Sequence, residues 1–186
     1  MDIQQKTNAA IQSAVADYEE GLRHLSPGGR PLYAPDIMAE KSTAIRAAYL
    51  AELARLEDMA RAAGAAAEST LEDGRRDPYS WLTDSELQRA TLLAPFVKED
   101  IEHGMVTSPA GDRAHAWLIW RAAVSTDNPN AEQLERAAWP DALHAAAETI
   151  IAARAAMSAI DFAQPDYEAG VRARYGIVDY PAASQF

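Results

Sequence analysis

The sequence predicts an all-α protein, in which a long helical hairpin is followed by a compact multi-helix domain and an extended C-terminal tail. Three observations predict this class. Apolar residues recur at intervals of three and four along residues 36–73, which is the period of one helix face. Thr83 and Glu86 have the spacing of a capping box, a signal that starts a helix. No segment alternates apolar and polar residues convincingly enough to predict a strand.

The first helix is expected from about residue 2 to residue 24. Its apolar residues step by four and three, as in the seam of a coiled coil, at Ile11, Val15, Tyr18, Leu22 and Leu25. Residues 26–31 (Ser-Pro-Gly-Gly-Arg-Pro) end it, because proline and paired glycines do not continue a helix.

The second helix is expected over residues 36–73, a stretch rich in strong helix formers and free of internal proline. At about 1.5 Å per residue it is roughly 50 Å long. It most simply pairs with the first helix as an antiparallel hairpin, with Tyr18 and Leu22 near Ile37, Met38 and Ile45.

The far end of the second helix is alanine-rich. Its apolar stripe thins from Ile, Tyr and Leu to Ala60, Ala63 and Ala67. The first helix reaches only about two-thirds of the way along it, so this end is expected to project. Small residues let another helix come close but bury little surface. We therefore expect these three alanines to bind a partner and the chain to form a homo-oligomer.

The domain boundary is expected at residues 75–82, after Asp73-Gly74 as a helix stop. The hairpin then occupies 1–74 and the helical domain 83–176. Within that domain the expected features are a helix start at Asp84, a kink or break at Pro95, a helix opening at Ser108-Pro109, a turn at 127–130, an interruption at Pro140 and a short helix from Pro165 to Tyr175.

The C-terminal tail, 177–186, has no helical period and contains Pro181. Large apolar residues on an extended acidic segment cannot all be buried locally, and such residues typically dock onto a neighbour. Tyr175, Tyr180 and Phe186 are therefore predicted partner-binding residues.

Composition excludes several classes of function. The 186 residues carry a net charge of −11, and the basic residues are scattered, so no basic stripe for reading nucleic acid is formed. The absence of cysteine excludes disulfides, thiolate sites and the usual structural zinc sites. With no signal-peptide pattern and no apolar run of membrane-spanning length, the expected location is the cytoplasm or a virion assembled there, without a membrane partner.

Histidine–carboxylate pairs are the only candidate metal ligands. Three pairs stand four residues apart: Glu20 with His24, Glu99 with His103, and His144 with Glu148. Carboxylate-bridged di-iron bundles need Glu-x-x-His on two helices, a motif this chain lacks. Ordinary solvated pairs explain the spacing, and we predict no metal, no cofactor and no catalytic residue.

Two tryptophans raise a second alternative. Trp117 and Trp120, with Arg113 and Arg121, either line a ligand pocket or pack in the core of a tryptophan-rich helix. Core packing is the favoured interpretation, and a ligand-binding bundle stays open beside it.

Three segments resemble small helical proteins encoded among bacteriophage head genes. These are 25–30 (Leu-Ser-Pro-Gly-Gly-Arg), 45–50 (Ile-Arg-Ala-Ala-Tyr-Leu) with the helix rich in Glu, Leu and Arg that follows it, and 85–102, from Ser-Glu-Leu to Asp-Ile-Glu. The resemblance implies a virion or head-assembly protein, such as a connector, a minor capsid component or a scaffold, whose partners are itself and other virion proteins. It implies no catalytic residue.

The sequence therefore favours a non-enzymatic structural and interaction protein of a phage particle. The alternatives are a cytoplasmic helical adaptor or regulator, a ligand-binding bundle, and a metal-dependent bundle enzyme.

Overall fold

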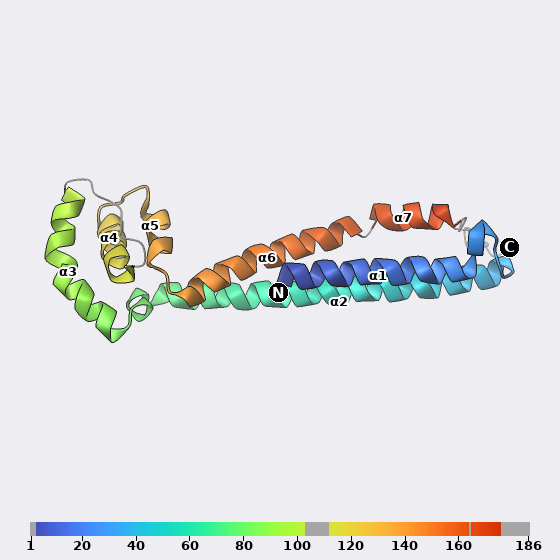
Figure 1. Ribbon diagram of the computed structural model, residues 1–186, viewed down its shortest axis with the longest axis horizontal. Helices are drawn as coiled ribbons and strands as arrows, with labels where there is room; N and C mark the ends of the chain where they lie inside the picture. The colour runs from blue at the N-terminus through green and yellow to red at the C-terminus, as the bar shows by residue number, and fades with distance from the viewer. Residues whose placement is uncertain (1–2, 103–111, 164, 176–186) are drawn as a thin grey trace, which may run out of the picture. The chain divides into compact units, whose positions relative to one another are not determined.

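The computed structural model describes residues 3–102, 112–163 and 165–175. Within them every regular element is helical, which confirms the all-α class (Figure 1). The elements are α1 (Ile3–Leu25), the short 3₁₀ helix η1 (Pro27–Gly29), α2 (Pro35–Arg76), the 3₁₀ helix η2 (Pro78–Trp81), α3 (Asp84–Glu102), α4 (Arg113–Ser125), α5 (Ala131–Ala138), α6 (Asp141–Ala163) and α7 (Pro165–Arg174).

The chain divides into two units. The first combines residues 1–65 with 149–186, and we call it the hairpin unit. The second comprises residues 66–148 and holds all four tryptophans, so we call it the tryptophan unit. This division differs from the predicted boundary at 75–82, because the chain returns after the second unit and adds helices to the first.

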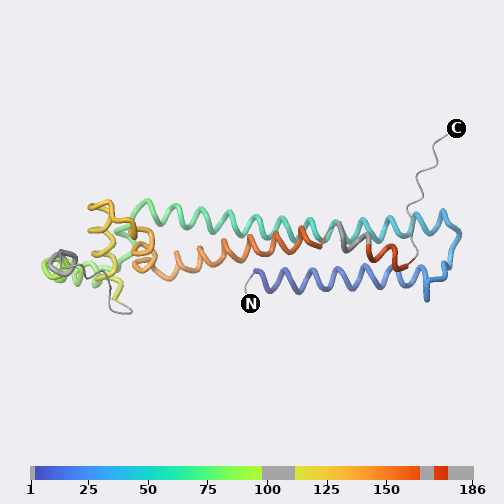
Figure 2. Tube along the Cα trace, turned by 90° about the horizontal axis from the view of Figure 1, so that it is seen from above, coloured from blue at the N-terminus to red at the C-terminus, as the bar shows by residue number. Residues whose placement is uncertain are grey.

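The hairpin unit begins with α1 and α2, which run antiparallel as predicted (Figure 2). The turn between them uses Gly28 and Gly29, whose φ angles of 63° and 77° suit glycine. Tyr18 of α1 stacks on Tyr49 of α2 with ring centroids 4.8 Å apart. The core is formed by Ala14, Tyr18, Leu22, Leu25, Met38, Tyr49, Leu53 and Leu56 of the hairpin. Ile37, expected in this contact, is exposed instead.

A third helical layer completes the hairpin unit. Ile160 of α6 and Val171 of α7 are buried in the same core as α1 and α2. The Tyr49 hydroxyl donates a hydrogen bond of 3.0 Å to the backbone oxygen of Ala163 at the end of α6. The sequence did not predict that a segment more than 100 residues downstream would pack on the hairpin.

The alanine-rich part of α2 does not project, so that prediction is wrong. Ala60 and Ala67 are buried within the chain and Ala63 is half-buried. In the hairpin unit α6 comes so close that a Cβ placed on Gly64 would lie 3.4 Å from the Cβ of Ala153. Small residues on both helices permit this approach, and the partner that the alanines need belongs to the same chain.

The tryptophan unit forms its core from α3, α4, α5 and the segments that flank them. The buried side chains are Trp81, Leu82, Ala90, Ala114, Ala116, Trp117, Ala138, Trp139 and Leu143. The predicted capping box is confirmed: the backbone N–H of Thr83 donates to Glu86 Oε2 at 2.8 Å, and α3 begins at Asp84. Leu82 is buried and Leu87 packs against the same core, as expected for a hydrophobic staple.

Residues 75–82 are packed structure and not a linker. Arg75 and Arg76 are the last residues of α2, and Arg75 Nε lies 2.7 Å from Glu135 Oε1. The buried Trp81 donates from Nε1 to the backbone oxygen of Gly74 at 2.8 Å. The helix therefore passes the expected stop at Gly74, because tertiary contacts hold its last turn.

Later helix boundaries follow the predictions in part. α3 continues through Pro95 without a break. α4 begins at Arg113, where Asp112 caps it by accepting from the N–H of His115. The interruption before Pro140 is confirmed, with α5 ending at Ala138 and α6 beginning at Asp141. Residues 108–109 and the predicted tail, 177–186, lie outside the described residues.

Candidate functional site

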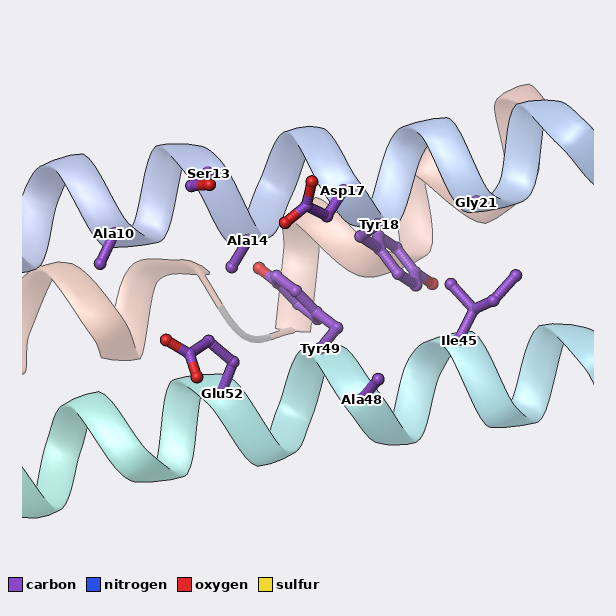
Figure 3. Close-up of a pocket in the computed structure, with 10 residues that line it drawn as sticks. All are labelled: Ala10, Ser13, Ala14, Asp17, Tyr18, Gly21, Ile45, Ala48, Tyr49 and Glu52. Atoms are coloured by element: carbon purple, nitrogen blue, oxygen red, sulfur yellow. The ribbon is translucent and has the colours of Figure 1, made fainter.

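A groove of about 600 Å³ runs between α1 and α2 in the hairpin unit (Figure 3). It lies over the stacked rings of Tyr18 and Tyr49, while small side chains form most of the rest. Its lining residues are Ala10, Ser13, Ala14, Asp17, Tyr18 and Gly21 of α1 with Ile45, Ala48, Tyr49 and Glu52 of α2.

The groove is narrow at the end where Gly21 of α1 faces Ile45 of α2. At the tight end a Cβ placed on Gly21 would lie 3.1 Å from Cγ2 of Ile45, so the helices are close there. Ala10 and Glu52 mark the opposite end (Figure 3). Alanine and serine at the helix contact leave the space that leucine or isoleucine would fill. The groove is thus a consequence of the small residues on α1 and α2.

Two carboxylates line the groove, and they differ in charge balance. Arg55 donates from Nε to Glu52 Oε2 at 2.8 Å, and this hydrogen bond lowers the pKa of the Glu52 carboxyl. Arg55 therefore already balances the charge of Glu52. Asp17 is an exposed carboxylate on α1 within the lining.

An exposed apolar face lies on α6 in the hairpin unit. Ile151 and Phe162 have 68% and 82% of their surface exposed. They are 11 residues apart, close to three helical turns, so they point to the same side. Ala155 and Ser158 lie between them on that side, and we call these four residues the α6 ridge.

A second exposed apolar face lies on α3 in the tryptophan unit. Leu92 and Phe96 are 74% and 65% exposed and stand four residues apart, so they share one side of the helix. Ala94 and Pro95 are exposed beside them. Neighbouring exposed apolar side chains of this kind are one mark of a protein contact site.

The tryptophan cluster is mainly core, with a small hollow at its edge. Trp117 is buried and donates from Nε1 to the backbone oxygen of Pro78 at 2.9 Å. The Arg121 guanidinium lies 4.9 Å from the Trp117 ring centroid and 5.0 Å from that of Tyr79. The hollow of about 280 Å³ is lined by Pro78, Tyr79, Trp117, Trp120, Arg121, Val124 and Ser125.

Arg113, which the sequence grouped with the tryptophans, lies elsewhere. Its guanidinium is 3.0 Å from Glu86 Oε2 at the start of α3. It joins two helices of the tryptophan unit and does not line the hollow.

The predicted partner-binding residues that the structure describes are engaged within the chain. Ala60 and Ala67 are buried and Ala63 is half-buried. Tyr175 is half-buried against the core of the hairpin unit, and Arg23 donates a hydrogen bond to it that raises the pKa of the arginine. Tyr180 and Phe186 lie outside the described residues.

The sequence pattern singled out neither Phe162 nor Ile151 as a surface residue. One signal was present: Ile150 and Ile151 are adjacent, about 100° apart on a helix, so they cannot both point at one core. Ile150 is the buried one.

The histidine–carboxylate pairs are surface features where they are described. Glu20 Oε1 and His24 Nε2 are 3.7 Å apart and both side chains are exposed. His144 and Glu148 are exposed, whereas the Glu99 side chain and His103 lie outside the described part. Across the described residues no three or more His, Cys, Asp or Glu side chains are grouped to hold a metal ion.

Two further findings bear on the chain as a whole. No helix in the described ranges combines the length and the apolar character needed to cross a membrane. Comparison with known protein families, curated proteins and solved structures finds no match to this chain.

Proposed function

We propose that this chain is a non-enzymatic structural and interaction protein, and that it serves as a bacteriophage virion or head-assembly component. One observation carries the interaction role: two helices each present a pair of large apolar side chains to solvent. These pairs are Ile151 with Phe162 on α6 and Leu92 with Phe96 on α3.

Burying one large apolar side chain contributes about 1.5–3 kcal/mol, so either pair supplies a useful part of a protein–protein contact. The two pairs belong to different units, which lets one chain bind two kinds of neighbour. A particle component needs this property, because it joins copies of itself to other proteins of the shell or its connector.

The phage assignment rests on the resemblance of segments 25–30, 45–50 and 85–102 to proteins encoded among head genes. The last of these segments includes Phe96 of the exposed α3 face. A cytoplasmic adaptor or regulator would use the same surfaces in another setting, in the cytoplasm and without a particle.

The test combines gene order with particle composition. We expect portal, protease and capsid genes beside the gene for this chain, and the chain at a fixed ratio to capsid protein in purified particles or their precursors. A matched pair of phages, one wild-type and one with Leu92→Asp and Phe96→Asp, tests the α3 surface. The double variant should fold, by circular dichroism, yet be depleted from particles.

Absence of the chain from purified particles and precursors, together with neighbouring genes unrelated to heads, would contradict the proposal and favour the adaptor.

A ligand-binding role is the second candidate, because Arg121 and the tryptophans border the 280 Å³ hollow. Typical small-molecule sites measure roughly 300–1,000 Å³, so the hollow suits only a small ligand. Native mass spectrometry of the purified protein tests it. A bound mass that is lost in Trp120→Ala would support this role, and bare protein would exclude it as the main one.

A further inference from the structure

The α1–α2 groove and the α6 ridge have matching lengths. Ala10 and Gly21, at the two ends of the groove, are 11 residues apart on α1, and Ile151 and Phe162, at the two ends of the ridge, are 11 residues apart on α6. At about 1.5 Å per residue both distances are about 16 Å. One surface is lined largely by small side chains and the other ends in two large ones.

The two surfaces do not satisfy each other within one copy. Ile151 and Phe162 stay exposed although the groove lies in the same unit. A second copy of the chain supplies the missing partner for each surface.

The shapes suit helix packing in which large side chains enter spaces on the facing helices. Ala155 and Ser158 are small, so the centre of the ridge can approach α1 and α2 closely.

Charge fixes the direction in which the ridge would lie. Arg154 is exposed and stands three residues from Ile151, while Asp17 stands four residues from Gly21. With Ile151 at the Gly21 end, Arg154 of one copy lies at nearly the same height along the helices as Asp17 of the other copy. The guanidinium of Arg154 has five N–H donors, so it can bind Asp17 in addition to another acceptor. The reverse direction separates them by about a helical turn.

We infer that the α6 ridge of one copy seats in the α1–α2 groove of a second copy, with Phe162 near Ala10 and Ile151 near Gly21. This inference rests on the proposed structural role and names its self-association partner. Because ridge and groove are different surfaces, the contact is heterologous, and successive copies form a ring or an open filament.

The experiment uses two full-length variants. Phe162→Asp removes the ridge at an exposed position, and Ala48→Trp fills the groove at another exposed position. Wild-type protein should form species larger than dimers as concentration rises, measured by light scattering and native mass spectrometry. Each variant alone should self-associate at least about tenfold more weakly. Leu92→Asp, on α3, is the matched control and should associate like the wild type.

Mixing the two variants gives the decisive result. Phe162→Asp keeps an intact groove and Ala48→Trp keeps an intact ridge, so the mixture should form a 1:1 heterodimer and nothing larger. Circular dichroism checks that each variant folds. If helical content is lost, Phe162→Ser replaces Phe162→Asp as the ridge variant, and Ser13→Trp replaces Ala48→Trp as the groove variant.

Three results would overturn the inference: monomeric wild-type protein at all concentrations, variants that associate like the wild type, or single variants that are monomeric and stay monomeric when mixed. None of these decides the proposed function, which particle composition tests separately.

Discussion

The hairpin unit and the tryptophan unit fill their interiors with different side chains. In the hairpin unit, alanine and glycine let long helices approach each other, and tyrosine and leucine fill the wider places. In the tryptophan unit, indole rings occupy the centre, and the N–H groups of Trp81 and Trp117 donate to backbone oxygens. Net charge differs as well: the hairpin unit has 10 basic and 13 acidic residues, whereas the tryptophan unit has 7 and 15.

The contrast shows how each interior specifies its partners. A buried indole has a distinctive shape and an N–H group that needs an acceptor, so it packs well against only one arrangement of neighbouring residues. An alanine stripe accepts any helix with small residues at the contact, so its partner depends on the rest of the chain. The hairpin unit is therefore the natural place for helix-to-helix association between copies.

The largest effect should come from the tryptophan core. Trp81→Ala removes a buried indole and its hydrogen bond to Gly74, and should lower the free energy of unfolding by about 3–5 kcal/mol. Denaturant unfolding followed by tryptophan fluorescence measures it, with the less buried Trp120→Ala as the milder control. An equal decrease in the free energy of unfolding in the two variants would show that the extent of burial does not determine how much each tryptophan contributes to stability.

A glycine in the tryptophan unit should tolerate no side chain. A Cβ at Gly74 would lie 2.4 Å from Cδ2 of Leu143, which is itself buried and has little room to move. Gly74→Ala should therefore destabilise the protein by about 1–3 kcal/mol through overpacking. Thermal melting is the measurement, and Leu143→Ala in the same chain should recover part of the loss that Gly74→Ala causes on its own.

A glycine in the hairpin unit should behave in the opposite way. A Cβ at Gly64 would meet Ala153 at an ordinary contact distance of 3.4 Å. Alanine also favours the helical backbone over glycine, so Gly64→Ala should stabilise by about 0.5–1 kcal/mol. Thermal melting of this variant beside Gly74→Ala compares the two helix contacts, and a lower melting temperature for Gly64→Ala would mean that α6 lies closer than described.

The smallest effect should be a pH dependence at the start of α3. Burial raises the pKa of the Glu86 carboxyl, but hydrogen bonds from the Thr83 N–H and hydroxyl, and the charge of Arg113, outweigh it and leave the pKa below its usual value. This interaction stabilises the fold above the unfolded-state pKa, about 4.3, and is lost as pH falls through the lower folded-state value.

The melting temperature of wild-type protein should therefore fall more steeply below about pH 4.3 than that of Glu86→Gln. Identical pH profiles for the two proteins would mean that the capping carboxylate contributes nothing to stability.

Local signals predicted much of the fold. The heptad-like steps from Ile11 to Leu25 match α1, and the Thr83–Glu86 capping box placed the start of α3 to the residue. Proline at 140 marked the break before α6. These features depend on neighbouring residues alone, which is why a sequence can show them.

Contacts between distant segments were not predictable in the same way. The alanines near Ala60 indicate that a helix can approach, but they do not say that the helix is α6, because alanine carries no shape that selects a partner. The cap at Asp112, where α4 begins, was likewise not identified from the sequence.

The candidate site was the least predictable feature. The groove exists because α1 and α2 pack with small residues along one side, and the exposure of Phe162 depends on how α6 is rotated against α2. Neither property follows from helical periodicity, since a phenylalanine near the end of a helix is ordinarily a core residue.

The central claim is that self-association belongs to the hairpin unit through the α6 ridge. Light scattering of Phe162→Asp and Leu92→Asp over the same concentration range tests it most directly, because both changes place a charge on an exposed apolar residue, one in each unit. We predict that Phe162→Asp stays monomeric where wild-type protein and Leu92→Asp assemble. Assembly of Phe162→Asp equal to that of the wild type would contradict the claim.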